Sequence, residues 1–265
     1  SIWPVELPVS VDAVFSNAKQ GPTELPFSAP APSHLAFIPF VSVQNMMALV
    51  HTIGIETFLR ELGEYLEADF KRWPEFDKTP RVAAHSAEGV IELMPTSDSS
   101  LYGFKYVNGH PKNMKEGLQT VTAFGMLADV ASGYPVLLSE MTLLTAFRTA
   151  ATSAMAAKYL APAHSKTMAI IGNGAQSEFQ AMAFREIVGI NALRQYDLDR
   201  SASEKCGRNL KGQGFDITLC MTSEDAVDGA ENGRADVCTT GRMTNLVGRT
   251  SRDKNKRRKR TTKKT

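Results

Sequence analysis

Three charged residues stand alone in apolar segments of the sequence. Glu92 interrupts the apolar run 90–94, Lys105 lies in the strand-like run 101–107, and Arg148 is the only charge between residues 143 and 157. Burying an unpaired charge costs free energy, so these side chains must pair with one another, reach solvent or bind a charged ligand. Two cations and one carboxylate suit an amino acid, with Lys105 and Arg148 on its carboxylate and Glu92 on an amine. An internal salt bridge, with the other charges reaching solvent, explains the same pattern.

A glycine-rich segment, Gly172-Asn173-Gly174-Ala175-Gln176-Ser177, lies between a predicted strand at 167–172 and a predicted helix at 178–188. Gly172 would allow the tight turn, and Gly174 would let the backbone approach a pyrophosphate at the helix N-terminus. Asp197 ends the next predicted strand, 23 residues after Gly174, close to the spacing of about 20 residues expected of a ribose-binding carboxylate. Because an acid repels a 2′-phosphate, the pattern predicts NAD rather than NADP. An ordinary turn followed by a surface aspartate is the alternative.

The hydrophobic periodicity divides the chain into two kinds of structure. A helix is predicted at about 58–72. A meander of antiparallel strands follows it, at 82–85, 90–94, 101–107, 121–130 and 134–138. An alanine-rich helix is predicted next, at about 141–160. From residue 167, predicted strands and helices alternate, as in a parallel doubly wound sheet. The order predicts an α/β protein with an N-terminal α+β substrate and dimerisation domain at 37–162 and an incomplete Rossmann-type NAD-binding domain at 163–240.

The composition excludes several other classes of protein. The 265 residues are 43% hydrophobic and 22% charged, which is typical of globular domains. No apolar run approaches the roughly 18–20 residues of a membrane-spanning helix, so a soluble, cytoplasmic protein is expected. The three cysteines form no CxxC pair and the five histidines lack ligand spacing, so neither a disulfide framework nor a metal site is expected.

The two ends of the chain differ from its centre. Residues 1–36 contain six prolines without a helical or alternating period, which predicts a disordered lead. Residues 249–265 carry ten Lys or Arg against one acid, so the formal charge of +2 conceals a charge of −7 over residues 1–248. The stretch 241–265 is predicted to be a disordered basic tail. A nuclear-localisation or nucleic-acid patch is an alternative, but a solvated tail explains the same residues and no nucleic-acid partner is expected.

Several segments together resemble a known family. They are residues 89–96, 102–111, 133–140, 144–151 and 171–180. They closely resemble the ornithine cyclodeaminase and mu-crystallin family over about residues 40–240. The string Tyr-Val-Asn-Gly-His-Pro at 106–111 is most similar to the ornithine cyclodeaminase branch of that family.

The resemblance implies an ammonia-lyase that acts as a homodimer and uses NAD in a redox-neutral conversion of L-ornithine to L-proline and ammonia. In that family, hydride passes from the substrate α-carbon to NAD, the imine loses ammonia as the δ-amine closes the ring, and hydride returns. The N-terminal domain would supply the dimer contact and the substrate pocket. No membrane partner is implied.

The resemblance also assigns roles to individual residues. Arg81, Lys105 and Arg148 would hold the ornithine carboxylate, and Glu92 would serve the amine end. The cofactor would be contacted by Thr120, Arg148, Gly172, Gly174, Ala175, Gln176 and Asp197. The family's general acid/base aspartate lies in a Gly-Gly-Asp segment that has no match in residues 241–265. The resemblance therefore predicts a C-terminally truncated member with impaired activity and no assigned catalytic residue.

Two other functions fit the same sequence. One is a cyclic imine reductase of the same family, acting on pyrroline- or piperideine-carboxylates. The other is a non-catalytic, crystallin-like protein that binds NAD or another small ligand without turnover.

Overall fold

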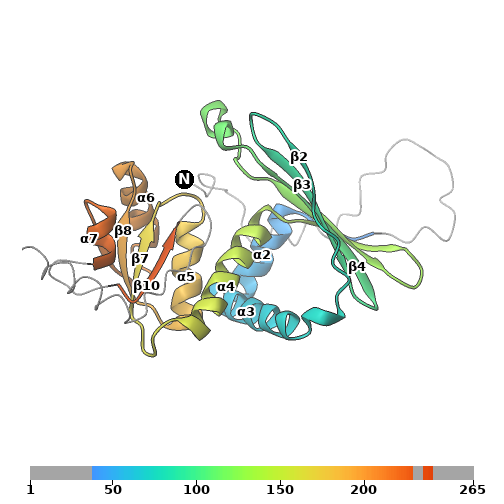
Figure 1. Cartoon of the computed structure of the whole chain (residues 1–265), viewed down its shortest axis with the longest axis horizontal. Coiled ribbons are helices and arrows are strands. Elements are labelled where there is room, and N and C mark those ends of the chain that lie inside the picture. Colours follow the sequence, from blue (N-terminus) through green and yellow to red (C-terminus); the bar gives the residue numbers. More distant parts are fainter. Residues whose placement is uncertain (1–37, 229–234, 241–265) are drawn as a thin grey trace, which may run out of the picture. The chain divides into compact units, whose positions relative to one another are not determined.

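Two separate β-sheets organise this protein. The computed structural model describes residues 38–228 and 235–240, so the predicted lead at 1–36 and tail at 241–265 lie outside the described residues. The helices and strands below belong to the unit that begins at Pro39 (Figure 1). In the described ranges, no helix is both long enough and apolar enough to cross a membrane.

The first sheet has six strands in the order β1-β6-β5-β4-β3-β2. Strands β2 to β6 form the predicted antiparallel meander, and β1 pairs in parallel with β6. The strands are β1 (Phe40–Val41), β2 (Val82–His85), β3 (Val90–Ser97), β4 (Leu101–Gly109), β5 (Ala123–Asp129) and β6 (Pro135–Glu140).

Strand β3 is longer than predicted, because it continues through Pro95. Pro95 pairs with Phe104 of β4, whereas the pairing of β2 with β3 ends at Leu93. Proline lacks the N–H that a ladder needs, so it is tolerated where a strand has a neighbour on one side only. The expected end at residue 94 was wrong for this reason.

Three helices adjoin this sheet in the sequence. Helices α2 (Val43–Ile53) and α3 (Ile55–Lys71) lie between β1 and β2, and α4 (Thr142–Leu160) follows β6. Helix α2 begins at a capping box, in which Ser42 Oγ accepts from Asn45 N at 3.2 Å and Asn45 Oδ1 accepts from Ser42 N at 3.0 Å. Helix α3 begins three residues earlier than predicted, immediately after Gly54. The short helices η1 (Trp73–Glu75) and η2 (Pro111–Glu116) lie in connecting segments.

The second sheet is parallel and has the order β10-β7-β8-β9. Its elements are β7 (Thr167–Ile171), α5 (Ser177–Val188), β8 (Ala192–Tyr196), α6 (Arg200–Leu210), β9 (Asp216–Leu219), α7 (Ser223–Asp228) and β10 (Val237–Thr240). The chain adds β8 and β9 on one side of β7 and then returns to place β10 on the other. Right-handed crossovers then place α7 on the opposite face from α5 and α6, and Figure 1 shows α7 and α5 on opposite sides of the strands. The predicted α/β, Rossmann-type class is confirmed, with its switch point between β7 and β10.

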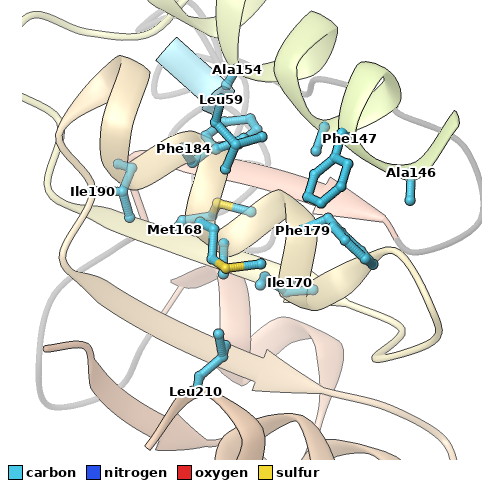
Figure 2. Close-up of a cluster of buried hydrophobic side chains, with 14 of the residues drawn as sticks. Leu59, Ala146, Phe147, Ala154, Met168, Ile170, Phe179, Phe184, Ile190 and Leu210 are labelled. Carbon is cyan, nitrogen blue, oxygen red and sulfur yellow. The ribbon is translucent and has the colours of Figure 1, made fainter. Parts of the chain in front are cut away.

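One hydrophobic core joins the helices of the N-terminal segment to the parallel sheet. Phe184 of α5, Leu59 of α3 and Ala154 of α4 are fully buried in the same cluster (Figure 2). Phe147 of α4 contacts the ring of Phe179 edge-on, with 5.0 Å between ring centroids. The alanines of α4 let this helix approach α5 closely. The core therefore runs across the predicted domain boundary at 162/163, which itself stays a prediction.

A charged cluster at the far ends of α3 and α4 gives a prediction for acid stability. Hydrogen bonds from Lys71, Tyr159 and Lys158, in decreasing order of effect, lower the pKa of Glu67 to about 2. Since the folded-state pKa lies below the ordinary value of 4.5, the stabilisation is complete above that value and is lost as the pH falls toward 2. We expect Glu67→Gln to flatten the dependence of the free energy of unfolding on pH between 4.5 and 2.

Urea unfolding at a series of pH values would measure this effect. Glu64→Gln is the matched control, because Glu64 lies on the same helix and is exposed. Equal pH dependence of the two variants would contradict the role of Glu67.

Candidate functional site

The lone charges of the N-terminal segment meet on one face of the six-stranded sheet. Glu92 lies opposite Val107, and Lys105 lies opposite Met94 and Gly125. Because alternate residues of a strand share a face, Glu92 and Lys105 point the same way. We call this the site face, defined by Glu92, Met94, Lys105, Val107 and Gly125.

Arg81, just before β2, makes an ion pair with Glu92 at this face. Its Nη1 donates to Glu92 Oε1 at 3.0 Å and to Oε2 at 3.2 Å. The side chain of Glu92 is 19% exposed and that of Arg81 is 57% exposed. The carboxylate is thus held from the solvent side by a guanidinium that solvent still reaches.

Lys105 and Arg148 carry the remaining positive charge. Burial lowers the pKa of Lys105, and the positive charges of Arg148 and Arg81 lower it further. The negative charge of Glu92 raises this pKa, but its effect is smaller. Burial, followed by the charge of Arg81, likewise lowers the pKa of Arg148. Taken as a whole residue, Arg148 nevertheless remains exposed to solvent. Among residues 38–228 and 235–240, neither side chain has a hydrogen bond or an ion pair.

Helix α4 brings Arg148 to the site face because of how the helix begins. A Cβ on Gly125 would collide with Met141 Sδ and with the carbonyl oxygen of Phe104, so glycine is needed where the start of α4 crosses the sheet. Glu140, which is buried, accepts from Thr142 N at 2.8 Å and from Leu143 N at 3.1 Å. A carboxylate at a helix N-terminus satisfies free N–H groups and favours the helix dipole.

Three cations, Arg81, Lys105 and Arg148, therefore gather with one carboxylate, Glu92, at the site face. Such an arrangement attracts an anion, and two unpaired cations can hold one carboxylate group through charge-assisted hydrogen bonds. The structure brings together all four predicted substrate residues, Arg81, Glu92, Lys105 and Arg148. The expected grouping put Arg81 with Lys105 and Arg148 on the substrate carboxylate. In the structure, Arg81 is instead paired with Glu92.

The glycine-rich segment forms the turn between β7 and α5. Gly172 has φ +85°, a left-handed conformation that favours glycine, and its N–H donates to Tyr196 O at 2.7 Å. Gly174 and Ala175 are exposed, and a Cβ on Gly174 would meet no atom within 4 Å. Gln176 is at the N-cap of α5, and its buried Oε1 has no hydrogen-bond partner in the described residues.

Asp197 lies just past the end of β8, beside this turn. Its Oδ2 accepts from Asn173 N at 2.5 Å and its Oδ1 accepts from Asp199 N at 2.9 Å. The acid predicted to bind a ribose is therefore adjacent to the loop predicted to bind the pyrophosphate.

These residues fit a dinucleotide. The open backbone at Gly174, the unpartnered Gln176 Oε1 and the Asp197 carboxylate all lie at the carboxyl ends of parallel strands, next to the switch point. NAD would be held there by the loop N–H groups, Gln176 and Asp197.

Thr120 lies between η2 and β5, where its carbonyl oxygen accepts from His110 N at 2.8 Å. In the part of the chain that the structure describes, no hydrogen bond joins Thr120 to the glycine-rich loop. Its predicted cofactor contact stays a prediction.

No role was predicted for the side chain of Asn173. This residue is 1% exposed, and its Nδ2 donates to Ser203 Oγ at 3.0 Å. An asparagine between two loop glycines was the only signal in the sequence. It could not identify the hydrogen-bond partner, because Ser203 lies 30 residues away.

The fold and the site define a Rossmann-type dinucleotide-binding protein. An adjoining α+β segment contains the six-stranded sheet, whose site face is suited to an anionic ligand. Residues 43–245 match the model of the ornithine cyclodeaminase/mu-crystallin family. The chain belongs to this family, as the sequence resemblance predicted.

The similarity to individual proteins is high over part of their length. An ornithine cyclodeaminase from Brucella suis biovar 1 (strain 1330) is 69% identical over 198 residues, which are 75% of this chain and 55% of that protein. One from Agrobacterium tumefaciens (strain Ach5) is 67% identical over 202 residues, 76% of this chain and 57% of that protein. The chain spans about half the length of the curated relatives it matches.

Three solved structures share the fold. A lysine cyclodeaminase, studied for its recognition of L-lysine, L-ornithine and L-2,4-diaminobutyric acid, is 25% identical with a TM-score of 0.70, covering 80% of this chain and 62% of that one. The Δ1-pyrroline-2-carboxylate reductase of Thermococcus litoralis, in complex with NADH and L-proline, is 28% identical with a TM-score of 0.67, covering 76% and 61%. An archaeal alanine dehydrogenase dimer with bound NAD is 27% identical with a TM-score of 0.66, covering 77% and 60%. The expectation of NAD as the cofactor agrees with the last two.

Proposed function

We propose that this protein is an ornithine cyclodeaminase, which converts L-ornithine to L-proline and ammonia with NAD. The observation that carries the proposal is the charge arrangement of the site face, where Lys105 and Arg148 lack protein partners in the described residues and Glu92 is held by Arg81. The high identity to proteins named ornithine cyclodeaminase supports the same substrate.

Each end of ornithine has a counterpart at this site. The two unpartnered cations bind the α-carboxylate, and the exposed position of Arg148 lets the substrate reach it. Glu92 accepts a hydrogen bond from a substrate amine, while its two hydrogen bonds to Arg81 fix the carboxylate in position. A lysine or arginine in place of Glu92 would repel that amine.

The turn after β7 and the acid after β8 support a binding position for the cofactor at the second sheet. When bound, NAD supplies a hydride acceptor that returns the hydride in the same catalytic cycle. The loop at residues 172–176 would hold the pyrophosphate, and Asp197 would accept from the ribose hydroxyls and repel a 2′-phosphate.

Stoichiometry tests the proposal. With L-ornithine and NAD, the purified protein should release proline and ammonia in equal amounts while the absorbance of NADH stays constant. A protein that binds NAD and L-ornithine but forms no proline would contradict the proposed activity and favour the non-catalytic binder.

A cyclic imine reductase is the second candidate, and the relative in complex with NADH and L-proline supports it. A pyrroline-carboxylate offers the same carboxylate to Lys105 and Arg148 but no distal amine to Glu92. For this activity, NADH would be consumed in proportion to proline formed from the imine, and L-ornithine would neither react nor compete.

We also propose that the protein is a homodimer that pairs through the other face of the six-stranded sheet. This apolar face is defined by the residues that alternate with the site face: Val82, Ile91, Leu93, Tyr102, Phe104, Tyr106, Phe124, Met126 and Leu138. Val82 is 65% exposed and Phe124 is 47% exposed. A contiguous exposed apolar surface of this kind is typical of a protein interface, and the related alanine dehydrogenase is a dimer.

Phe124→Asp is expected to weaken the dimer, because it places a charge beside Tyr106, whose ring stacks on Phe124 at 5.0 Å. The loss should be about 2 kcal/mol or more, a roughly 30-fold increase in the dimer dissociation constant. Sedimentation velocity over a concentration series would measure it.

Leu160→Asp is the control, because Leu160 is 67% exposed and lies on α4, away from the sheet. A dimer that Phe124→Asp leaves intact, or that Leu160→Asp weakens equally, would contradict pairing through the apolar face.

A further inference from the structure

Asn173, the residue between the two loop glycines, makes hydrogen bonds with both its backbone and its side chain. Its backbone N donates to Asp197 Oδ2 at 2.5 Å. Its side-chain Nδ2 donates to Ser203 Oγ at 3.0 Å, and both side chains are buried, with 1% and 3% of each residue exposed. The residue thus links the loop to the acid after β8 and to helix α6.

The same links continue through the start of α6. Asp199 N donates to Asp197 Oδ1 at 2.9 Å, and Asp199 Oδ1 accepts from Ser201 N at 2.9 Å as the N-cap of the helix. Each oxygen of the Asp197 carboxylate is therefore fixed by one backbone N–H, one from the glycine-rich loop and one from the helix cap. Each oxygen keeps a further lone pair for a ligand.

Stability alone does not account for an amide at this position. Asn173 Oδ1 is buried and has no hydrogen-bond partner in the described residues. Burying an amide with an unused acceptor costs free energy, and a small apolar residue would avoid that cost. The bond from Nδ2 to Ser203 is what the asparagine contributes, and it sets where the loop lies relative to Asp197.

We infer that Asn173 is a positioning residue for the adenosine ribose of NAD. Its hydrogen bonds to Ser203 and Asp197 keep the Asp197 carboxylate in place. In that place the carboxylate accepts from a 2′-hydroxyl and repels a 2′-phosphate. This inference rests on the proposed binding of NAD. A carboxylate free to rotate would lose an oriented hydrogen bond with NAD and would lose part of its repulsion of NADP. Asn173 therefore influences which of the two dinucleotides binds, although its buried side chain touches neither.

The test compares the affinities for NADH and NADPH by fluorescence titration. Asn173→Ala is expected to weaken NADH binding about tenfold, the effect of one hydrogen bond to a charged group, and to weaken NADPH binding less. The preference for NADH over NADPH falls accordingly. Ser203→Ala should lower the preference by a similar factor, and the double variant should show no more than the larger single effect, because both changes break the same link.

Ser153→Ala is the matched control. Ser153 is also a buried serine that accepts from a side-chain amide, Gln180 Nε2 at 3.3 Å, but it belongs to α4 and its partner to α5. It should lower the thermal midpoint to a similar extent and leave the dinucleotide preference unchanged.

Two results would overturn the inference, and they are distinguishable. If the unmodified protein binds neither dinucleotide, the proposed cofactor fails and the inference fails with it. If it binds NADH but the preference is unchanged in Asn173→Ala and Ser203→Ala, the inference alone fails. Should Asn173→Ala not fold, Ser203→Ala decides, since it removes only one hydroxyl from the same link.

Discussion

Replacing Arg148 with alanine is expected to weaken the binding of L-ornithine about 100- to 1,000-fold, equivalent to about 3–4 kcal/mol. Arg148 and Lys105 have no protein partners among the described residues, so both charges are available to one carboxylate. Without the guanidinium, Lys105 alone faces the substrate carboxylate while Arg81 stays paired with Glu92. Calorimetric titration with L-ornithine in the presence of NADH, which cannot accept the substrate hydride, measures the change without turnover. Steady-state proline formation with NAD should fall in parallel.

Two further variants separate the charge of Arg148 from its shape. Arg148→Lys keeps the charge but loses the planar fork that binds a carboxylate with two bonds, so an intermediate loss is expected. Lys158→Ala is the control, because Lys158 is a cation of the same helix but pairs with Glu67 at 3.1 Å. This variant should leave ornithine binding unchanged. If Arg148→Ala bound L-ornithine with unchanged affinity, this would contradict binding of the substrate carboxylate at the site face.

Phe184→Ala is expected to lower the free energy of unfolding by about 3–5 kcal/mol. Phe184 is fully buried in α5, where it lies in one cluster with Leu59 of α3 and Ala154 of α4 (Figure 2). The cavity would lie where the N-terminal helices contact the parallel sheet. Urea unfolding, read as a change in the midpoint at constant slope, measures the loss.

Tyr65→Ala is the control for this prediction. Tyr65 is also aromatic and lies on α3, but it is 71% exposed, so its removal should change stability by no more than about 0.5 kcal/mol. Similar losses in the two variants would mean that the core does not depend on the contact between α5 and the helices of the N-terminal segment. Two separate unfolding transitions in the unmodified protein would lead to the same conclusion.

The chemistry of the site could be predicted from residue types because isolated charges in apolar strands and helices are costly to bury. Glu92, Lys105 and Arg148 were identified in this way. That Glu92 and Lys105 lie on one face of the sheet depends on the register of β3 against β4, which only the structure gives. The pairing of Arg81 with Glu92 could not be predicted, because the two residues meet only when β2 turns back on β3.

Local signals were likewise reliable where the structure is local. The glycine-rich turn and the acid after the next strand follow from backbone geometry and from a short spacing, and the structure places them side by side. The link from Asn173 to Ser203 joins residues 30 positions apart. No sequence pattern specifies such a contact.

The amino-acid sequence alone was enough to predict the alternation of helices and strands, the parallel character of the second sheet and the candidate residues for binding an anion or a dinucleotide. These properties depend on periodicity, turn chemistry and charge, which act over a few residues. Three features could be seen only in the packed fold: β3 continues through Pro95, α3 and α4 share a core with α5, and Met141 at the start of α4 packs against Gly125 of the site face. These features depend on strand register and on packing between distant segments, and burial of apolar surface can select them only once the whole fold has formed.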